Sequence, residues 1–258
     1  MENKIIKNLS KICKTINCVN DELDIIKYSK DWRGRINEKA LCVVFPKNQD
    51  EVSKILKFCY DNDIKVIPQG GNTNLVASAS PSKEKKEIII SMEKINQIHH
   101  IDSLNKCVEV DAGVKIDDLN LRLEKDGFLF PLEMASTGSS QVGGVISTNA
   151  GGINVLHYGS VRNNLLGLNV VLSNGEILKL GTKVVKDNTG YNLKDLFCGS
   201  EGTLGIITRA TLKIYPKVQN YFTFIASFEN LKDVINFYEY ISKEFRFPIT
   251  GFEMIPQI

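Results

Sequence analysis

The sequence predicts an α+β protein in which two α/β lobes follow one another along the chain. Residues 41–68 show a strand, an amphipathic helix and a second strand, which is the pattern of a β-α-β unit. The strands expected after residue 100 follow one another more closely, with glycine-rich turns between them. We therefore expect a helical segment over 1–36, a main domain over 37–216 with lobes over 37–100 and 101–216, and the incomplete start of a further domain over 217–258.

The first lobe is predicted from its apolar periodicity. One or two short helices and a polar coil come first, and residues 41–45 (LCVVF) form a strand that Pro46 closes. A helix opens at Asp50, because four apolar residues then fall on a single helical stripe: Val52, Ile55, Leu56 and Cys59. Residues 65–68 (KVIP) form a second strand, which runs directly into a glycine pair.

The second lobe is predicted as mostly strands. The first lobe ends with a β-rich run over 87–91; the second begins with one over 107–113, and a short helix lies between Ile116 and Asp126, ended by Gly127. Residues 166–180 predict a hairpin, since Asn174-Gly175 supplies the positive φ angles of a tight turn. Residues 205–216 form a further strand. Beyond them we expect a strand over 221–227 and a helix whose apolar stripe is Val234, Phe237, Tyr238 and Ile241.

Composition excludes several classes of protein. The 32 Lys and Arg residues nearly balance the 30 Asp and Glu residues, so the net charge of +2 does not favour nucleic acid as a partner. The six cysteines include no C-x-x-C pair, and none lies beside a histidine at metal-ligand spacing, so no metal site is expected. No stretch is apolar for the length of a transmembrane helix, and the N-terminus has no continuous apolar leader. We expect a cytoplasmic protein.

Three segments combine glycine with small polar residues: 68–74 (PQGGNTN), 138–152 (GSSQVGGVISTNAGG) and 199–205 (GSEGTLG). Glycine lets backbone N–H groups approach a ligand closely, and successive N–H groups form a concave site for anions such as a pyrophosphate. Three such loops indicate a long ligand held at several points. The alternative is that they are only tight turns of a β-rich protein. The motifs G-x-G-x-x-G, G-x-x-x-x-G-K-[ST], H-E-x-x-H and G-x-S-x-G do not occur, which disfavours Rossmann dehydrogenases, P-loop nucleotidases and serine hydrolases.

Four ordered motifs carry a resemblance to a known family. They are P-Q-G-G-N-T at 68–73, G-G-V-I-S-T-N-A-G-G at 143–152, K-D-N-T-G-Y at 186–191 and G-S-E-G-T-L-G-I-I-T at 199–208. From about Asp31 to about Met254 the chain resembles the FAD-linked oxidases with a PCMH-type (vanillyl-alcohol-oxidase-like) FAD-binding domain. Within that family it is most similar to the branch of D-2-hydroxyglutarate and D-lactate dehydrogenases.

The resemblance implies FAD as the cofactor and assigns its contacts residue by residue. The first loop would wrap the pyrophosphate, the second segment would line the flavin and the middle of FAD, and the third would follow the adenosine part. The implied cofactor-binding residues are Gln69, Gly70, Gly71, Asn72, Thr73, Pro131, Gly138, Ser139, Gly143, Gly144, Thr148, Asn149, Gly151, Gly152, Glu201, Gly202 and Ile207.

The chain departs from the family pattern at three places. The first loop commonly continues N-T-G-x-V-G-G in the family, but here Asn74 stands for one glycine, and Ala77 and Ser78 stand for two more. If positions 77 and 78 require φ > 0, a side chain there is strained. An arginine usual before Tyr-Gly is His157 here.

The family also sets an expectation for function. Its members are nearly twice as long, and their second half supplies the substrate pocket, a catalytic histidine and, in the 2-hydroxyglutarate branch, metal ligands. We therefore expect the FAD-binding portion of a 2-hydroxy-acid dehydrogenase, inactive unless a missing C-terminal half, or one on a separate polypeptide, completes it. The alternative is a non-catalytic remnant or FAD-binding subunit. No catalytic residue can be assigned, because His99 and His100 are expected in a loop far from the flavin motifs, which leaves only His157 with a route to the flavin.

Overall fold

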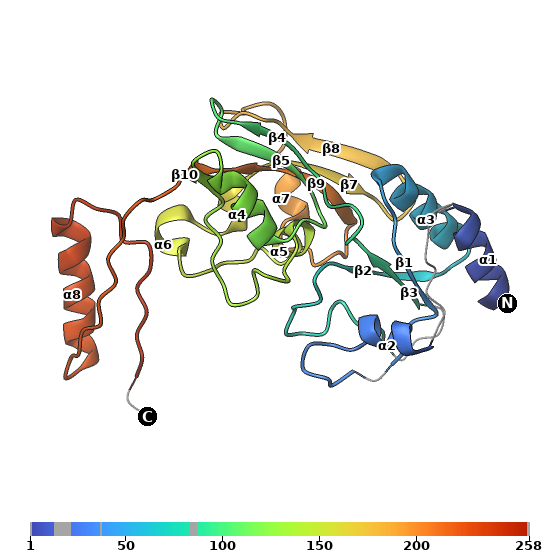
Figure 1. Ribbon diagram of the computed structural model, residues 1–258, viewed down its shortest axis with the longest axis horizontal. Helices are drawn as coiled ribbons and strands as arrows, with labels where there is room; N and C mark the ends of the chain where they lie inside the picture. The colour runs from blue at the N-terminus through green and yellow to red at the C-terminus, as the bar shows by residue number, and fades with distance from the viewer. Residues whose placement is uncertain (1, 13–21, 37, 83–86, 257–258) are drawn as a thin grey trace.

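The computed structural model describes residues 2–12, 22–36, 38–82 and 87–256 (Figure 1). Among these residues, the chain forms two principal sheets and a detached C-terminal helix.

The first sheet is parallel and follows the predicted β-α-β unit. Its strands are β1 (Cys42–Val44), β2 (Lys65–Gln69) and β3 (Glu87–Ser91), in the order β1-β3-β2. Helix α3 (Gln49–Asp61) connects β1 to β2, and the Asn48 side chain caps it by accepting a hydrogen bond from the Glu51 N–H at 2.9 Å. The predicted helical stripe is confirmed, because Val52, Ile55, Leu56 and Cys59 are the buried residues of α3.

Two helices at the N-terminus complete this sheet. Helix α1 (Glu2–Ile12) contributes Ile5 and Leu9 to the main core beside α3, whereas α2 (Glu22–Ser29) covers the opposite face of the sheet. On that face the Tyr28 ring lies edge-on to Phe45, with ring centroids 5.2 Å apart. Apolar side chains thus cover the sheet on both faces, as a parallel sheet requires. The part of the predicted helical segment over 13–21 lies outside the described residues.

The second sheet is antiparallel, in the order β4-β5-β9-β7-β8. Its strands are β4 (Ile98–Asp102), β5 (Cys107–Asp111), β7 (Leu165–Val171), β8 (Ile177–Gly181) and β9 (Ile206–Lys213). The predicted hairpin is confirmed: β7 pairs with β8, and Gly175 in the turn has φ +87°. The predicted strand over 205–216 is divided between β9 and β10 (Tyr215–Pro216), and β10 pairs with β6 (Phe128–Leu129).

Two elements were not anticipated. His99 and His100 lie on strand β4 and not in a loop; a register shift between Ile98 and His100 breaks the period-two alternation that reveals a strand in sequence. Within the second glycine segment, residues Val142–Ser147 form the short helix α5 despite their glycine pair. Helix α4 (Ile116–Glu124) confirms the short helix predicted between Ile116 and Asp126. Three further short helices were not predicted: α6 (Val155–Tyr158), the 3₁₀ helix η1 (Val161–Asn164) and α7 (Lys194–Phe197).

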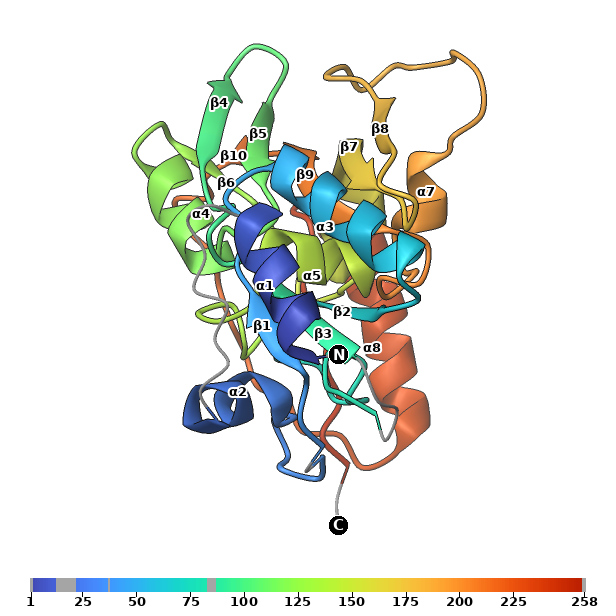
Figure 2. The ribbon, with the colours of Figure 1, turned by 90° about the vertical axis from the view of Figure 1, so that its right-hand side faces the viewer.

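The two sheets share one hydrophobic core. Helix α3 contacts β2 of the first sheet and β7 of the second, so it bridges the two sheets, whereas α5 packs on β5 and β9 of the second (Figure 2). The Ser53 hydroxyl on α3 donates to the Gly175 carbonyl of the hairpin turn at 2.6 Å. The main cluster of buried residues accordingly runs from β1 and β3 through α3 and α5 to β5, β7 and β9. The division into lobes over 37–100 and 101–216 remains a prediction; because β4 pairs in the second sheet, we propose a junction between Ser91 and Ile98.

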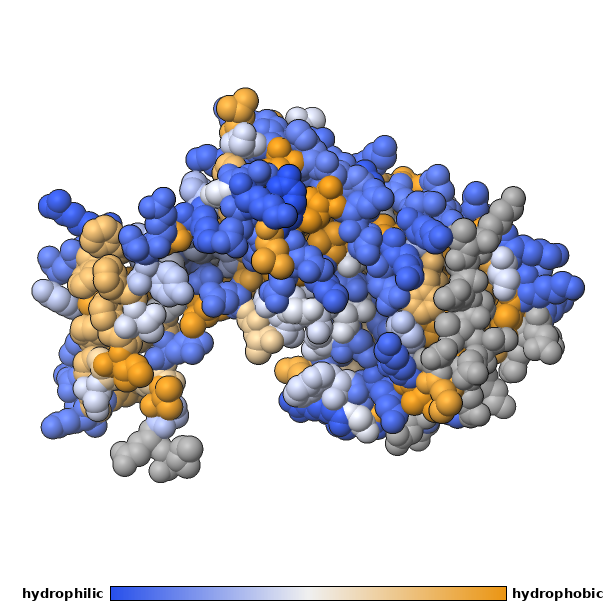
Figure 3. All heavy atoms as spheres, viewed as in Figure 1, coloured by the Kyte–Doolittle hydropathy of each residue, from blue (hydrophilic) through white to orange (hydrophobic). Residues whose placement is uncertain are grey.

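The C-terminal segment stands apart from this core. Residues 217–230 include no strand, so the strand predicted over 221–227 is wrong; no neighbouring strand pairs with this run, and an unpaired strand leaves its backbone groups without partners. Helix α8 (Leu231–Glu244) is present, and its predicted stripe is its least exposed side, but none of its residues is buried. Hydrophobic side chains are visible on its surface (Figure 3).

Candidate functional site

The three glycine segments meet at one place, the junction between the two sheets. We call them the first glycine loop (68–74), the second glycine segment (138–152) and the third glycine loop (199–205). The Thr73 and Ser140 hydroxyls lie 3.0 Å apart, which joins the first to the second. The backbone N–H groups of Gly199 and Glu201 donate to the carbonyls of Ile146 and Ser147 at 3.1 and 2.9 Å, which joins the third to the second.

The first loop is held by the N-terminal segment. The amide nitrogen of Gln69 donates to the carbonyls of Tyr28 and Ala79, both at 2.8 Å, and that of Asn72 donates to the carbonyl of Lys30 at 2.7 Å. The Arg35 guanidinium donates to the Leu75 carbonyl at 2.8 Å. Gln69 is only 2% exposed, so its side chain fixes the loop from within. The loop therefore has a defined shape that does not depend on a ligand.

Arg35 is positioned by a turn that the Asp31 side chain stabilises. The buried Asp31 carboxylate accepts hydrogen bonds from the backbone N–H groups of Ile36 at 2.9 Å and Arg35 at 2.6 Å. These bonds, the one from Ile36 foremost, lower the pKa of Asp31. The predicted polar coil around residues 31–35 is thus a support for the first glycine loop.

Gly71 and Gly144 show why glycine is needed here. A Cβ atom on Gly71 would lie 1.9 Å from the Ser139 carbonyl oxygen, so only glycine allows the first loop to reach the second segment. A Cβ on Gly144 would meet nothing within 4 Å. A Cβ on the neighbouring Gly143 would instead lie 2.8 Å from the Ala112 Cβ, so Gly143 allows α5 to pack closely against Ala112. Of these two glycines, only Gly144 faces open space. Gly144 therefore leaves room for a ligand to approach its backbone.

The remaining predicted residues of the second segment lie in and around α5. Thr148 is exposed, and its hydroxyl donates to the Gly144 carbonyl at 3.1 Å. Asn149 has φ +48°, and its side-chain oxygen accepts from the Arg162 N–H at 3.0 Å. Gly138 and Ser139 are exposed in the turn before α5, and Gly151 is exposed after it. Pro131 and Gly152 line a small cavity of about 10 Å³ on the other side of this segment.

The third loop brings its two predicted residues, Glu201 and Gly202, to the junction. Glu201 is exposed with φ +50°, and Gly202, with φ +80°, faces Pro68 at the start of the first loop. Ile207, in contrast, lies on β9 and is 4% exposed within the main core. Its contact with a cofactor stays a prediction.

Arg162 was missed by sequence reasoning. Its guanidinium donates to the Asp195 carbonyl at 2.6 Å and to the Cys198 carbonyl, directly before the third glycine loop. The Asn149 side chain accepts a hydrogen bond from the Arg162 backbone N–H. Arg162 therefore connects the second segment to the residues that precede the third loop. No sequence signal reveals this role, because its partners are backbone carbonyls more than thirty residues away.

Four buried polar atoms lack a hydrogen-bond partner among the described residues. They belong to the first loop, the turn after it and the start of α5: Asn72 Oδ1, Asn74 Nδ2, Ser80 Oγ and Gln141 Oε1. Buried polar groups without partners destabilise a fold, so their concentration in one place indicates a polar ligand. Both donors and acceptors are among them, which fits a cofactor with phosphates and hydroxyl groups such as FAD.

Ala77 occupies a left-handed conformation, with φ +60°. The expectation of positive φ is thus confirmed for Ala77, but Ser78 does not share it; its N–H donates to the Asn74 side chain at 3.0 Å. We expect Ala77→Gly to raise the free energy of unfolding by about 1 kcal/mol, because glycine adopts this conformation without strain. Urea unfolding measures it, with Ser78→Gly as the matched control that should bring no gain. Equal stabilisation by both variants would contradict the explanation.

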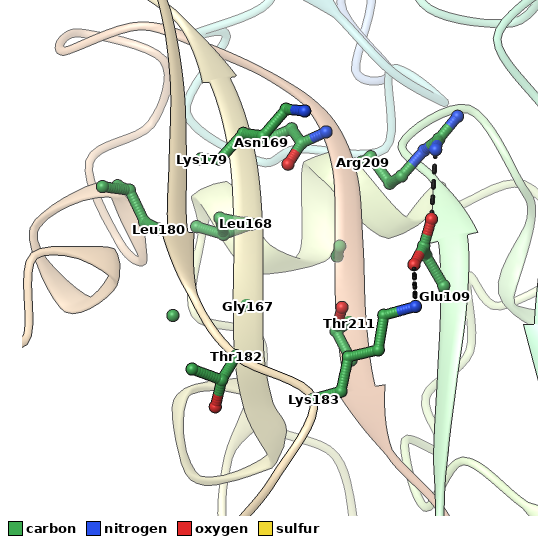
Figure 4. Close-up of a pocket in the computed structure, with 12 residues that line it drawn as sticks. Glu109, Gly167, Leu168, Asn169, Lys179, Leu180, Thr182, Lys183, Arg209 and Thr211 are labelled. Atoms are coloured by element: carbon green, nitrogen blue, oxygen red, sulfur yellow. Dashed lines mark hydrogen bonds and ion pairs between the residues drawn. The ribbon is translucent and has the colours of Figure 1, made fainter. Parts of the chain in front are cut away.

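A larger cavity lies elsewhere, on the outer face of the second sheet (Figure 4). Its volume is about 240 Å³, and its charged lining residues largely pair with each other. Glu109 accepts from Lys183 at 2.8 Å and from Arg209 at 3.1 Å, and the hydrogen bond from Lys183 is the main cause of its lowered pKa. None of the three glycine segments contributes to this cavity.

The histidines give no metal site. His99 pairs with the buried Asp111 at 2.7 Å on the second sheet, and His157 on α6 is exposed with its ring against Tyr158, at a centroid distance of 4.4 Å. Within the described ranges, no group of three or more His, Cys, Asp or Glu residues is placed to hold a metal ion.

A parallel and an antiparallel sheet with a common core, and three glycine segments meeting where they join, define a domain that binds a nucleotide-containing cofactor. The family model described as "FAD binding domain" matches residues 40–181, and the chain belongs to that family. The predicted PCMH-type fold is confirmed by a solved structure of alkyldihydroxyacetonephosphate synthase. The likeness has a TM-score of 0.75 at 24% identity and covers 84% of this chain and 41% of the synthase.

The curated relatives are dehydrogenases of the predicted branch. The chain is 37% identical to the D-2-hydroxyglutarate–pyruvate transhydrogenase of Saccharomyces cerevisiae, over 87% of this chain and 49% of that protein. It is 36% identical to the D-2-hydroxyglutarate dehydrogenase of Arabidopsis thaliana, over 85% of this chain and 39% of that protein. The chain is thus an FAD-binding domain homologous to these enzymes. It spans about half the length of the yeast relative and less than half of the Arabidopsis relative.

The expectation of a cytoplasmic location is wrong by this comparison. The relatives from Arabidopsis thaliana, Bos taurus and Schizosaccharomyces pombe are named as mitochondrial proteins. Among the described helices, none combines the length and apolar character needed to cross a bilayer.

Proposed function

We propose that this chain binds FAD at the junction of its three glycine segments and forms the flavin-binding portion of a 2-hydroxy-acid dehydrogenase. The observation that carries the proposal is that the three segments are hydrogen-bonded to one another, while the Cα of Gly144, in the second segment, faces open space. The unpartnered polar atoms of the first loop and α5 support it, because a dinucleotide offers partners for both donors and acceptors.

Each glycine segment would have its own part in binding. The first loop, with Gly70, Gly71, Asn72 and Thr73, would lie along the pyrophosphate. The second segment, with Gly144, Thr148 and Asn149, would line the middle of the cofactor, and the third loop would follow the adenosine side. When bound, FAD supplies the hydride acceptor, flavin N5. The chain's own residues bind and orient the cofactor.

The substrate chemistry follows from the relatives. Oxidation of a 2-hydroxy acid moves a hydride from the α-carbon and requires a base within hydrogen-bond reach of the hydroxyl. We propose that this base lies outside the present residues, in a C-terminal half like that of the relatives. Residues 217–256 would begin that further domain, which accords with the finding that no residue of α8 is buried.

A dye-reduction assay tests this function. The chain loaded with FAD is offered D-2-hydroxyglutarate, D-lactate and glycolate, alone and together with a co-expressed C-terminal half of the Arabidopsis relative. We expect no turnover alone and measurable turnover of at least one acid with the second half. Substantial turnover by the chain alone would contradict the assignment of the base, and His157→Ala would then be the first variant to examine. An inactive combination would favour a non-catalytic FAD-binding subunit.

A further inference from the structure

The side-chain amide of Asn74, in the first glycine loop, makes a hydrogen bond within the described part of the protein at one end but not at the other. Its Oδ1 accepts a hydrogen bond from the Ser78 N–H at 3.0 Å, so the orientation of the amide group is determined. The other end of the amide, Nδ2, is buried and has no partner among the described residues. Asn74 therefore presents an unsatisfied donor within the proposed cofactor site.

The same loop also contains an acceptor that has no partner in the part of the chain that the structure describes. Asn72 Oδ1, two residues earlier, is also buried and without a partner among the described residues, so the two atoms do not bond to each other. The orientation of Asn72 is determined as well, because its Nδ2 donates to the Lys30 carbonyl. The fold thus keeps a donor and an acceptor apart in one loop, which suits a ligand that reaches both.

The ligand that suits this donor is one that offers acceptors. Beside the loop, the Arg35 guanidinium donates to the carbonyl of Leu75, the next residue after Asn74, and its charge is paired with the Asp31 carboxylate at 3.4 Å. The loop follows β2 and connects it to β3 (Figure 1). A phosphate offers only acceptor oxygens to a neutral amide donor, and hydrogen bonds to charged acceptors are the stronger ones.

We propose that Asn74 Nδ2 donates a hydrogen bond to a phosphate oxygen of the FAD pyrophosphate. This inference rests on the proposed function and adds a side-chain contact at a position where the resembling family commonly has glycine. Asn74 would then compensate in part for the two glycines that the loop lacks at positions 77 and 78.

Two variants at Asn74 test the contact. Asn74→Ala removes the donor, whereas Asn74→Asp keeps the acceptor that caps Ser78 and replaces the donor by a negative charge. We expect Asn74→Ala to raise the Kd for FAD about tenfold and Asn74→Asp to raise it about a hundredfold at low salt. The difference between them should shrink as salt rises, because exposed charge repulsion is screened. Riboflavin, which lacks phosphate, should bind both variants as it binds the original chain.

The controls separate this contact from folding and from flavin binding itself. Thermal unfolding without flavin shows whether each variant folds, and Asn96→Asp applies the same change of charge at an exposed site outside the three segments. Unchanged FAD affinity in folded Asn74→Ala and Asn74→Asp would overturn the inference, and so would an equal loss of riboflavin affinity. Failure of the original chain to bind FAD would instead overturn the proposed function.

Discussion

Replacement of Gly71 by alanine is expected to lower the free energy of unfolding by roughly 3 kcal/mol and to remove FAD binding. The new Cβ would lie 1.9 Å from the Ser139 carbonyl oxygen and 2.7 Å from its carbon, and backbone atoms cannot rotate away as a flexible side chain can. The first loop and the second segment must therefore separate. Urea unfolding and an FAD titration of the same protein measure the two effects.

Gly127→Ala is the control for this prediction. Gly127 ends α4 with φ +76°, and a Cβ there would meet nothing within 4 Å. We expect a loss of about 1 kcal/mol from the left-handed backbone alone, with unchanged affinity for FAD. If Gly71→Ala behaved like Gly127→Ala, the close approach of the two segments would not be what holds the site together.

Removal of the Arg162 side chain is expected to have the second largest effect. Arg162→Ala leaves the carbonyls of Asp195 and Cys198 without their charged donor, which should cost about 3 kcal/mol of stability. The third glycine loop then has to be ordered by the cofactor itself, so the Kd for FAD should rise about tenfold. Faster tryptic cleavage after Lys194, which lies in the tethered chain, would report the loosened loop directly.

Arg162→Lys separates geometry from charge. A lysine keeps the positive charge but cannot reproduce the fork of donors that spans two carbonyls, so we expect an intermediate result. Affinity and proteolysis unchanged in Arg162→Ala would show that the third loop is held without this residue.

The first sheet could be predicted because each of its elements carries a local signal. The stripe on α3 and the uninterrupted apolar runs of β1 and β3 depend only on neighbours along the chain. Strand β4 could not, because the register shift and two adjacent histidines hide its alternation. The run over 221–227 shows the opposite case: its composition favours a strand, but a strand forms only where another offers its hydrogen bonds.

The candidate site was predicted as three segments but not as a geometry. Glycine-rich composition marks where the backbone approaches something closely, yet it does not tell whether that is protein or ligand. Gly71 meets the Ser139 backbone, whereas Gly144 faces open space, although both belong to family motifs. Likewise, nothing in the sequence distinguishes Arg162, which acts on distant carbonyls, from other surface arginines.

A titration of the purified chain with FAD, followed by flavin fluorescence and absorbance, tests the central claim most directly. Gly144→Ala is measured beside it, because the added methyl group meets no protein atom beyond the backbone of its own helix within 4 Å and would intrude only on a bound ligand. The account predicts saturable binding of one FAD per chain, weakened at least tenfold in a Gly144→Ala protein that folds as stably as the original or more so. Absence of saturable binding, or equal affinity in both proteins, would contradict the placement of FAD at the junction of the three glycine segments.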